Sequence, residues 1–241
     1  MMGRRRLVFI SAVSSFVVCL VFVGFMLILC KVNSARTPKE IYRESLSSVV
    51  EFKSTAGDGK ECYGSAVVMS DDGRLVTNAH LVMYKQSGIY RQFKTFEIRS
   101  AYEESYEPAA LLKYDMTLDI AVLQVKNTED NHSFLPVKTG DSAKLKTGNR
   151  VYAIGNALNQ GISITQGIIS LAQVDIEYEG IIRNMIQCDL TINEGNSGGA
   201  LLNKDGKMIG MPSFRLKEDG EIVQGLAYCI PMNLIASFYQ S

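Results

Sequence analysis

The sequence predicts an all-β domain built as two β-barrels, preceded by an apolar N-terminal segment. Most of the chain after that segment consists of short β-branched apolar runs separated by turn signals, such as 65–69, then Asp71-Asp72-Gly73, then 75–77. A polar stretch at 126–133 divides these runs into two halves of roughly 90 to 100 residues, an ordinary size for small domains. Further runs lie at 93–98, 109–112, 120–125, 151–154, 162–164, 168–171, 185–188, 200–202 and 208–211.

Composition limits the classes of protein that the chain can represent. Of its 241 residues, 46% are hydrophobic and 21% are charged, close to globular averages, so we expect a buried core and exclude a disordered chain. Lys plus Arg equals Asp plus Glu at 25 each, but four of the basic residues lie in the first 31 positions, which hold no acid. The remainder has a net charge of about −4, which does not attract a phosphate backbone. We therefore expect no nucleic-acid partner.

The first element is the apolar segment 7–30, which contains 24 residues without a charge. A membrane-spanning helix needs about 20 apolar residues, whereas the core of a secretory signal has about 7 to 15, so length favours a retained transmembrane anchor. Three arginines precede it, and the positive-inside rule places residues 1–6 in the cytoplasm and the main domain outside. Two alternatives remain open: cleavage by a signal peptidase near 32–34, and a lipoprotein signal ending at Cys30.

A linker at 31–40, with Pro38 as a break, follows the anchor, and Ile41 then begins a brief amphipathic helix that runs into the first strand. The first barrel is expected over about 41–128 and the second over about 134–231. A C-terminal helix at 231–240, with Pro231 in its first turn, completes the domain 41–241. Because the chain ends there, no further domain is expected.

Cysteine and histidine are both scarce. Two of the five cysteines lie in the apolar segment, and Cys62, Cys188 and Cys229 are expected to be small buried hydrophobic side chains that form at most one disulfide. The chain has two histidines and neither a C-x-x-C nor an H-E-x-x-H motif. We therefore expect no metal site and no cofactor.

Three short motifs carry residues suited to nucleophilic catalysis. Ser197 lies in a Gly-rich run at 194–199 (Glu-Gly-Asn-Ser-Gly-Gly), where backbone N–H groups can approach a reacting carbonyl; a plain Gly-rich hairpin loop is the alternative. His80 ends an apolar strand and can act as a general base, although a structural histidine is the simpler interpretation of that motif alone. His132 lies in the polar connector and is expected at the surface.

Asp119 immediately precedes the buried strand 120–125. A carboxylate there needs a donor, and the N–H of a histidine is one that would also fix the orientation of the ring. The alternatives are a turn or capping aspartate at this position, and Asp115 as the functional acid in its place.

The chain order His80, Asp119, Ser197, with separations of 39 and 78 residues, resembles that of chymotrypsin-like serine proteases, and the surrounding motifs are similar to those of the HtrA (Deg) branch. The resemblance runs from about residue 41 to the C-terminus. The similar segments are 64–68 (Gly-Ser-Ala-Val-Val), 75–80 (Leu-Val-Thr-Asn-Ala-His), 118–123 (Leu-Asp-Ile-Ala-Val-Leu), 153–156 (Ala-Ile-Gly-Asn), 163–170 (Ser-Ile-Thr-Gln-Gly-Ile-Ile-Ser), 187–199 (Gln-Cys-Asp-Leu-Thr-Ile-Asn-Glu-Gly-Asn-Ser-Gly-Gly) and 225–231 (Gly-Leu-Ala-Tyr-Cys-Ile-Pro).

This resemblance implies two six-stranded antiparallel barrels with a catalytic triad between them. Ser197 would be the nucleophile, His80 the general base and acid, and Asp119 the orienting carboxylate, with an oxyanion hole at Gly195, Asn196 and Ser197. The implied activity is a membrane-anchored extracytoplasmic serine endopeptidase of protein quality control, which cuts unfolded or damaged polypeptides. A homotrimer is the implied assembly.

The resemblance also points to a substrate pocket for the residue before the cut. Thr191 occupies the position at which similar enzymes with basic specificity carry Asp, so we expect a preference for small or medium uncharged aliphatic residues. The expected pocket residues are Thr191, Met211, Ser213, Phe214, Leu226 and Ala227.

Two departures from the family pattern bear on function. No peptide-binding PDZ domain is expected after residue 231, and Glu194 replaces the usual Pro before the Gly-Asn-Ser motif, where a bulky anion can perturb the oxyanion turn. Two alternatives to the enzyme therefore stay open. One is a catalytically idle protease-like binding or sensor module, and the other is an unrelated β-barrel lectin or carrier.

Overall fold

The computed structural model describes residues 17–24, 26, 36–125, 134–178, 180–218 and 221–241. Thr37–Ser241 form one compact unit, and the residues before them form a separate one. Of the predicted anchor 7–30, only 17–24 and 26 are described; these are helical. No helix within the described ranges is both long enough and apolar enough to cross a membrane. The basic tail 1–6, residues 31–35 of the linker and the connector with His132 lie outside the described residues.

The domain begins with helix α2, Pro38–Ser45. Thr37 caps it, since the Thr37 hydroxyl accepts a hydrogen bond from the backbone N–H of Glu40 while the Glu40 carboxylate accepts one from the Thr37 backbone. Pro38 follows directly, where its fixed φ suits the first helical turn. The helix therefore starts inside the segment predicted as a linker, and it buries Ile41 in the core.

The first half of the domain forms a closed barrel with the strand order β1-β2-β3-β8-β7-β6, and all of its strand pairs are antiparallel. A separate hairpin, β4-β5, turns at Ser87 and Gly88, both with positive φ. The sequence analysis missed this hairpin because its second strand is exposed throughout and has no alternating apolar pattern. The strands are β1 (Val49–Thr55), β2 (Glu61–Val68), β3 (Arg74–Thr77), β4 (Met83–Gln86), β5 (Ile89–Gln92), β6 (Thr95–Arg99), β7 (Glu107–Asp115) and β8 (Ile120–Val125).

Strands β9 to β14 of the second half pair in the ring order β10-β11-β14-β13-β12-β9. The two apolar runs predicted at 162–164 and 168–171 belong to one long strand, β10, which pairs with β9 through its first part and with β11 through its second part. Register shifts after Ile169 and Leu171 allow it to bend from one neighbour to the other. The strands are β9 (Arg150–Gly155), β10 (Ser163–Tyr178), β11 (Ile181–Cys188), β12 (Ala200–Asn203), β13 (Met208–Glu218) and β14 (Glu221–Pro231).

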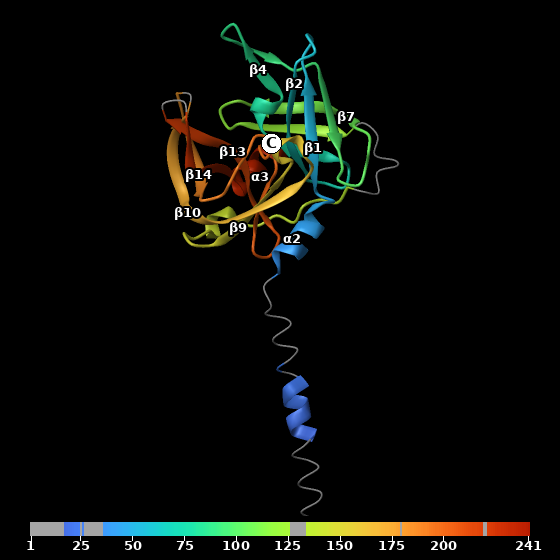
Figure 1. The fold of residues 1–241 in the computed structure, drawn as a ribbon, viewed down its shortest axis with the longest axis vertical. Coiled ribbons are helices and arrows are strands. Elements are labelled where there is room, and N and C mark those ends of the chain that lie inside the picture. The colour runs from blue at the N-terminus through green and yellow to red at the C-terminus, as the bar shows by residue number, and fades with distance from the viewer. Residues whose placement is uncertain (1–16, 25, 27–35, 126–133, 179, 219–220) are drawn as a thin grey trace, which may run out of the picture. The chain divides into compact units, whose positions relative to one another are not determined.

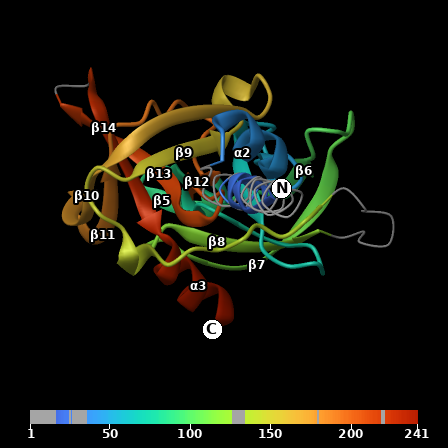
Figure 2. The same cartoon turned by 90° about the horizontal axis from the view of Figure 1, so that it is seen from below.

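The fold is therefore mostly β and of the chymotrypsin-like kind, as predicted. The strands of the two halves gather on opposite sides of the domain in Figure 1, cyan to green against yellow to red. Helix α3, Met232–Gln240, contacts β13, β14 and β8, and α2 contacts β9 (Figure 2). Pro231 is the N-cap of α3 rather than its first residue. Three short 3-10 turns, η1 (Ala79–Leu81), η2 (Ser142–Lys144) and η3 (Ala157–Asn159), complete the described elements.

Several strands are buried on both faces, because one face packs inside their own barrel and the other packs against the opposite half. On β3, Leu75 packs inside the first barrel while Val76 faces the second half, and on β8 Leu123 and Val122 divide in the same way. Alternate side chains of a strand point to opposite faces, so each of these strands serves two cores. Tyr152 of β9, in the second half, belongs to the same hydrophobic cluster as Val76 and Val122. The site residues lie at the ends of these doubly buried strands.

Two of the three cysteines predicted to be buried agree with the prediction, whereas Cys62 is only half-buried. Cys188 and Cys229 are fully buried and unbridged in the interior of the second half. A hydrogen bond with Cys188 and burial raise the pKa of the Cys229 thiol well above its usual value. Both thiols therefore pack as small apolar groups.

Candidate active site

His80 lies in η1, directly after strand β3, and Asp119 directly precedes strand β8. Strands β3 and β8 are antiparallel partners with Thr77 opposite Ala121, so the end of one strand lies beside the start of the other. Asn78, fully buried between them, donates from Nδ2 to the Asp119 carbonyl over 3.1 Å. The pairing of two neighbouring strands thus brings the histidine and the aspartate together.

The Asp119 carboxylate holds the His80 ring. Nδ1 of His80 lies 3.0 Å from both carboxylate oxygens, and the His80 backbone N–H donates to Oδ1, also over 3.0 Å. Asp119 is 4% exposed, and its φ of +57° places it in the left-handed region, which few residues other than glycine adopt. With Nδ1 protonated toward Asp119, Nε2 is the ring nitrogen that can accept a proton.

Asp119 remains ionised despite its burial. Burial acts to raise the pKa of this carboxyl, but the charge of His80 and the hydrogen bonds donated by His80 and Ser213 outweigh it, and the pKa is lowered. The Ser213 hydroxyl donates to Oδ2 over 2.5 Å. A buried anion supplied with donors in this way can stabilise an imidazolium at His80.

Ser197 lies in the loop between β11 and β12, and its hydroxyl donates to the Ser213 carbonyl over 2.9 Å. Ser213 on β13 therefore contacts both the candidate nucleophile and, through its own hydroxyl, Asp119. The sequence analysis placed Ser213 only in the substrate pocket. A serine hydroxyl has one proton, so Ser197 must turn from the Ser213 carbonyl before it can donate to His80.

The loop before Ser197 presents backbone donors. The Glu194 carbonyl accepts a hydrogen bond of 2.7 Å from the backbone N–H of Leu158, and the N–H of Gly195, across the same trans peptide, points to the other side. Within the described part of the chain, no backbone carbonyl accepts from the N–H of Gly195 or of Ser197. The N–H of Asn196, the third predicted oxyanion donor, is already bonded to the Asn193 carbonyl over 3.0 Å.

Gly195 is required by its surroundings. Its φ is +96°, and a Cβ at this position would lie 2.0 Å from the Asn156 carbonyl oxygen. With Glu194 in place, the Glu194 carbonyl is bound to the Leu158 N–H and Gly195 has a positive φ.

A buried serine of the first barrel, Ser65 on β2, supports this loop from behind. Its hydroxyl donates to the Gly195 carbonyl over 2.7 Å and accepts from the Asn156 N–H over 2.8 Å. Its own backbone N–H donates to the Ser197 carbonyl over 2.9 Å. The sequence analysis quoted Ser65 within a family motif but gave it no role, since no local pattern relates it to residues more than 90 positions away.

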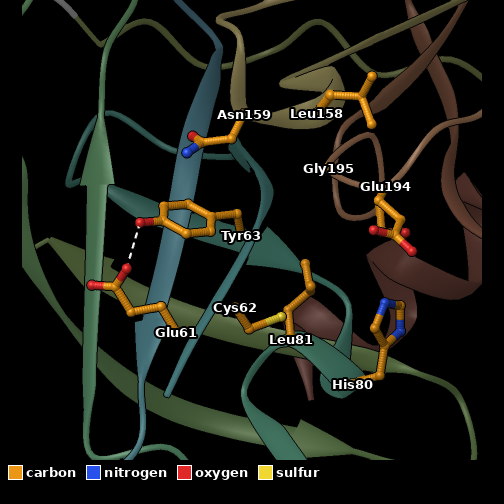
Figure 3. Close-up of a pocket in the computed structure, with 10 residues that line it drawn as sticks. Glu61, Cys62, Tyr63, His80, Leu81, Leu158, Asn159, Glu194 and Gly195 are labelled. Atoms are coloured by element: carbon orange, nitrogen blue, oxygen red, sulfur yellow. Dashed lines mark hydrogen bonds between the residues drawn. The ribbon is translucent and has the colours of Figure 1, made fainter. Parts of the chain in front are cut away.

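A cavity of about 530 Å³ opens at the site (Figure 3). Ser197, His80 and Gly195 line it, together with other loop residues and the start of β2. The remaining lining residues are Glu61, Cys62, Tyr63, Leu81, Leu158, Asn159 and Glu194. Sequence reasoning named none of these as binding residues.

The predicted pocket residues lie elsewhere. Met211 and Ala227 are fully buried in the core, Thr191 is exposed, and Leu226 is half-buried. Phe214 is stacked between Tyr178 and Tyr228, with ring centroids 4.0 Å and 5.2 Å away. None of the six predicted pocket residues lines the described cavity.

Comparison with known proteins agrees with this arrangement. Residues 64–211 match the trypsin-like peptidase domain family. The chain is 36% identical over 173 residues to serine endoprotease DegS of Haemophilus influenzae, an alignment covering 71% of this chain and 47% of DegS. It is 38% identical over 172 residues to the serine protease Do-like HtrB of Bacillus subtilis, covering 68% of this chain and 34% of that protein.

Among solved structures, the HtrA-type protease AlgW with tripeptide is similar, with a TM-score of 0.72 and 28% identity over 86% of this chain and 63% of AlgW. The chain spans about half, or less, of the length of the curated relatives named above. The family match over residues 64–211 includes His80, Asp119 and Ser197. The chain therefore belongs to the trypsin-like peptidase domain family, with relatives among the HtrA and Deg serine proteases.

Proposed function

We propose that this chain is a serine endopeptidase that hydrolyses peptide bonds through an acyl-enzyme. The observation that carries the proposal is the contact of the buried Asp119 carboxylate with His80 Nδ1 at 3.0 Å, because His80 and Ser197 line the same cavity. This contact orients a base at the nucleophile, and the N–H groups of Gly195 and Ser197 supply the donors that an oxyanion requires.

The reaction follows from these positions. Ser197 gives its proton to Nε2 of His80 as its Oγ attacks the scissile carbonyl, and Asp119 stabilises the imidazolium. The N–H groups of Gly195 and Ser197 bind the oxyanion of the tetrahedral intermediate. His80 then gives the proton to the leaving amine, and water, activated by the same histidine, releases the acyl group.

The substrate preference and cellular setting belong to the same proposal. Unfolded or damaged polypeptides are the proposed substrates, with uncharged aliphatic residues before the cut, set by Thr191 and its apolar neighbours. Residues 7–30 are proposed to anchor the domain 41–241 on the extracytoplasmic side of a membrane, and trimerisation is proposed by analogy with relatives. The name of one relative, the periplasmic pH-dependent serine endoprotease DegQ of Escherichia coli, supports the extracytoplasmic setting.

The second candidate is a catalytically idle binding or sensor module with a protease fold. The observation that favours it is the Ser197 hydroxyl, which donates to the Ser213 carbonyl rather than toward a base. The endopeptidase is preferred because every group that the reaction uses is present, and a single rotation about χ1 of Ser197 redirects its proton.

A serine-reactive fluorophosphonate probe separates the two. We expect the wild-type chain to be labelled, and the Ser197→Ala and His80→Ala variants to remain unlabelled although folded. Labelling that persists in folded Ser197→Ala would show that another residue reacts. A folded wild-type protein that resists the probe would establish the idle module.

A further inference from the structure

The cavity in front of Ser197 lies on the side of the site that the leaving half of a substrate would occupy. His80 must deliver a proton to the leaving amine, so the chain after the cut passes beside its ring. The cavity runs from Ser197 past His80 and Leu81 to the start of β2, and the residues predicted to hold the side chain before the cut are not part of it. Its volume of about 530 Å³ is within the range of binding clefts for side chains and small ligands.

Two carboxylates stand in the walls of this cavity. Glu194 enters from the loop before Gly195 and Glu61 from the start of β2, and Figure 3 shows the Glu194 carboxylate directed toward the His80 ring. The Glu61 carboxylate accepts a hydrogen bond of 2.6 Å from the Tyr63 hydroxyl, which orients it. Apart from His80, these two glutamates are the only residues in the described lining that can be charged near neutral pH, and neither Lys nor Arg is present there.

The charge of one cation, Lys60, reaches this wall of the cavity. Lys60 is exposed and outside the lining. At the Cys62 thiol, burial raises the pKa, the charge of Lys60 lowers it, and the charge of Glu194 raises it by less than Lys60 lowers it. The described lining that a ligand contacts therefore presents two acidic side chains and neither Lys nor Arg, while Lys60 opposes them from outside the lining.

We propose that this acidic cavity selects polypeptides with Lys or Arg at the first or second position after the cut, and that Glu194 is the main specificity-determining residue. This inference rests on the proposed endopeptidase function. A basic side chain carries the charge to pair with Glu194, which lines the same cavity as Ser197. An acidic side chain at the same position meets two like charges. Selection on the leaving side is independent of the aliphatic preference before the cut.

The test uses internally quenched peptides that are identical except for Lys, Gln or Glu at the first or second position after the cut. A single exposed ion pair has a small effect, but attraction of Lys and repulsion of Glu combine here, so we expect kcat/KM for Lys to exceed that for Glu by about 3- to 10-fold. The ratio should shrink at 0.5 M salt. Glu194→Gln should bring it to less than half of the wild-type ratio, and Glu61→Gln should lower it less.

Glu104→Gln is the matched control, because it removes an exposed carboxylate of the same domain that does not line the cavity. It should leave the Lys to Glu ratio at the wild-type value. Equal kcat/KM for the three peptides in the wild type, or a ratio that Glu194→Gln does not change, would overturn the proposal. An equal fall of the Lys to Glu ratio in Glu104→Gln would also overturn the proposal, because it would show that the preference comes from the overall charge of the domain and not from the cavity.

A binding measurement keeps the inference separate from catalysis. Dissociation constants of the same peptides on the full-length Ser197→Ala variant, measured by fluorescence anisotropy, should follow the order Lys, Gln, Glu from tightest to weakest. If the wild type is labelled by the fluorophosphonate but these constants are equal, the selection fails and the endopeptidase stands. If the order holds while the wild type is unlabelled, the cavity selects basic peptides in an idle module and the proposed function fails.

Discussion

The Ser65 hydroxyl donates a hydrogen bond of 2.7 Å to the carbonyl oxygen of Gly195, 130 residues later in the chain. Through this bond a strand of the first barrel holds the loop that carries the candidate nucleophile, Ser197, in the second half. The same hydroxyl accepts from the Asn156 N–H, so one buried side chain satisfies two backbone groups behind the oxyanion donors. Loss of a buried partner of this kind leaves polar groups unpaired and the loop less constrained.

Ser65→Ala should therefore reduce activity as well as stability. We expect a loss of about 1 to 3 kcal/mol in the free energy of unfolding, because the Asn156 N–H and the Gly195 carbonyl lose their partner, and a fall in kcat with a smaller change in KM. Urea unfolding and steady-state kinetics measure the two effects. Ser45→Ala is the control: Ser45 is also buried and bonds a backbone carbonyl, but in helix α2, and it should lose stability alone. Normal kcat in Ser65→Ala would contradict the positioning role.

Gly195→Ala should abolish the oxyanion site. A Cβ there meets the Asn156 carbonyl oxygen at 2.0 Å, and the φ of +96° is strained for alanine, so the peptide that presents the Gly195 N–H must rotate. Removal of one oxyanion donor typically lowers kcat by about 10²- to 10³-fold, which is the expected loss. Gly59→Ala is the control, because Gly59 also has a positive φ, +85°, but open space around a Cβ. This variant should lose only about 1 kcal/mol in the free energy of unfolding and keep full activity. A fully active Gly195→Ala would show that this N–H is not used.

Asp119→Asn should preserve the fold at neutral pH and nearly eliminate catalysis. The amide can still accept from Ser213, but it does not hold His80 in the tautomer that leaves Nε2 free to accept a proton, nor stabilise the imidazolium. Catalytic triads lose about 10⁴-fold in kcat on this change, and a similar loss is expected here. Circular dichroism checks the fold, and peptide hydrolysis the rate. A loss below tenfold would assign the orienting role to another group.

The same carboxylate makes stability depend on pH in the acid range. Burial alone would raise the pKa of Asp119, but His80 and Ser213 lower it below the value of 3.8 for a free side chain. Because the folded state binds this proton more weakly than the unfolded state, ionised Asp119 stabilises the fold fully above about pH 4, and this contribution disappears as pH falls through the lower folded pKa. Urea unfolding of the wild type and Asp119→Asn between pH 7 and pH 2.5 should give a difference in unfolding free energy that shrinks only below pH 4. A constant difference over that range would exclude the linkage.

Much of the fold and of the candidate site could be predicted because the relevant signals are local. Strands β3 and β8 are buried on both faces, so they appear in the sequence as short continuous apolar runs, and turn residues mark their ends. His80, Asp119 and Ser197 stand at recognisable strand ends and in a Gly-rich loop, and the structure places all three at one site. The hairpin β4-β5 escaped prediction because its outer strand is exposed and packs on no core.

The sequence by itself determined the all-β architecture, the order of the barrels and the kinds of side chain available for chemistry, since these follow from periodicity, turn residues and residue type. Tertiary structure decided which distant groups meet. Ser65 supports Gly195, and Ser213 bonds both Asp119 and Ser197. Glu61 and Glu194 line one cavity. No local sequence pattern relates these residues, because they meet only when the strands of each half pair and the two halves pack together. Binding surfaces and supporting hydrogen bonds arise between elements, so they are visible only once the elements have been assembled.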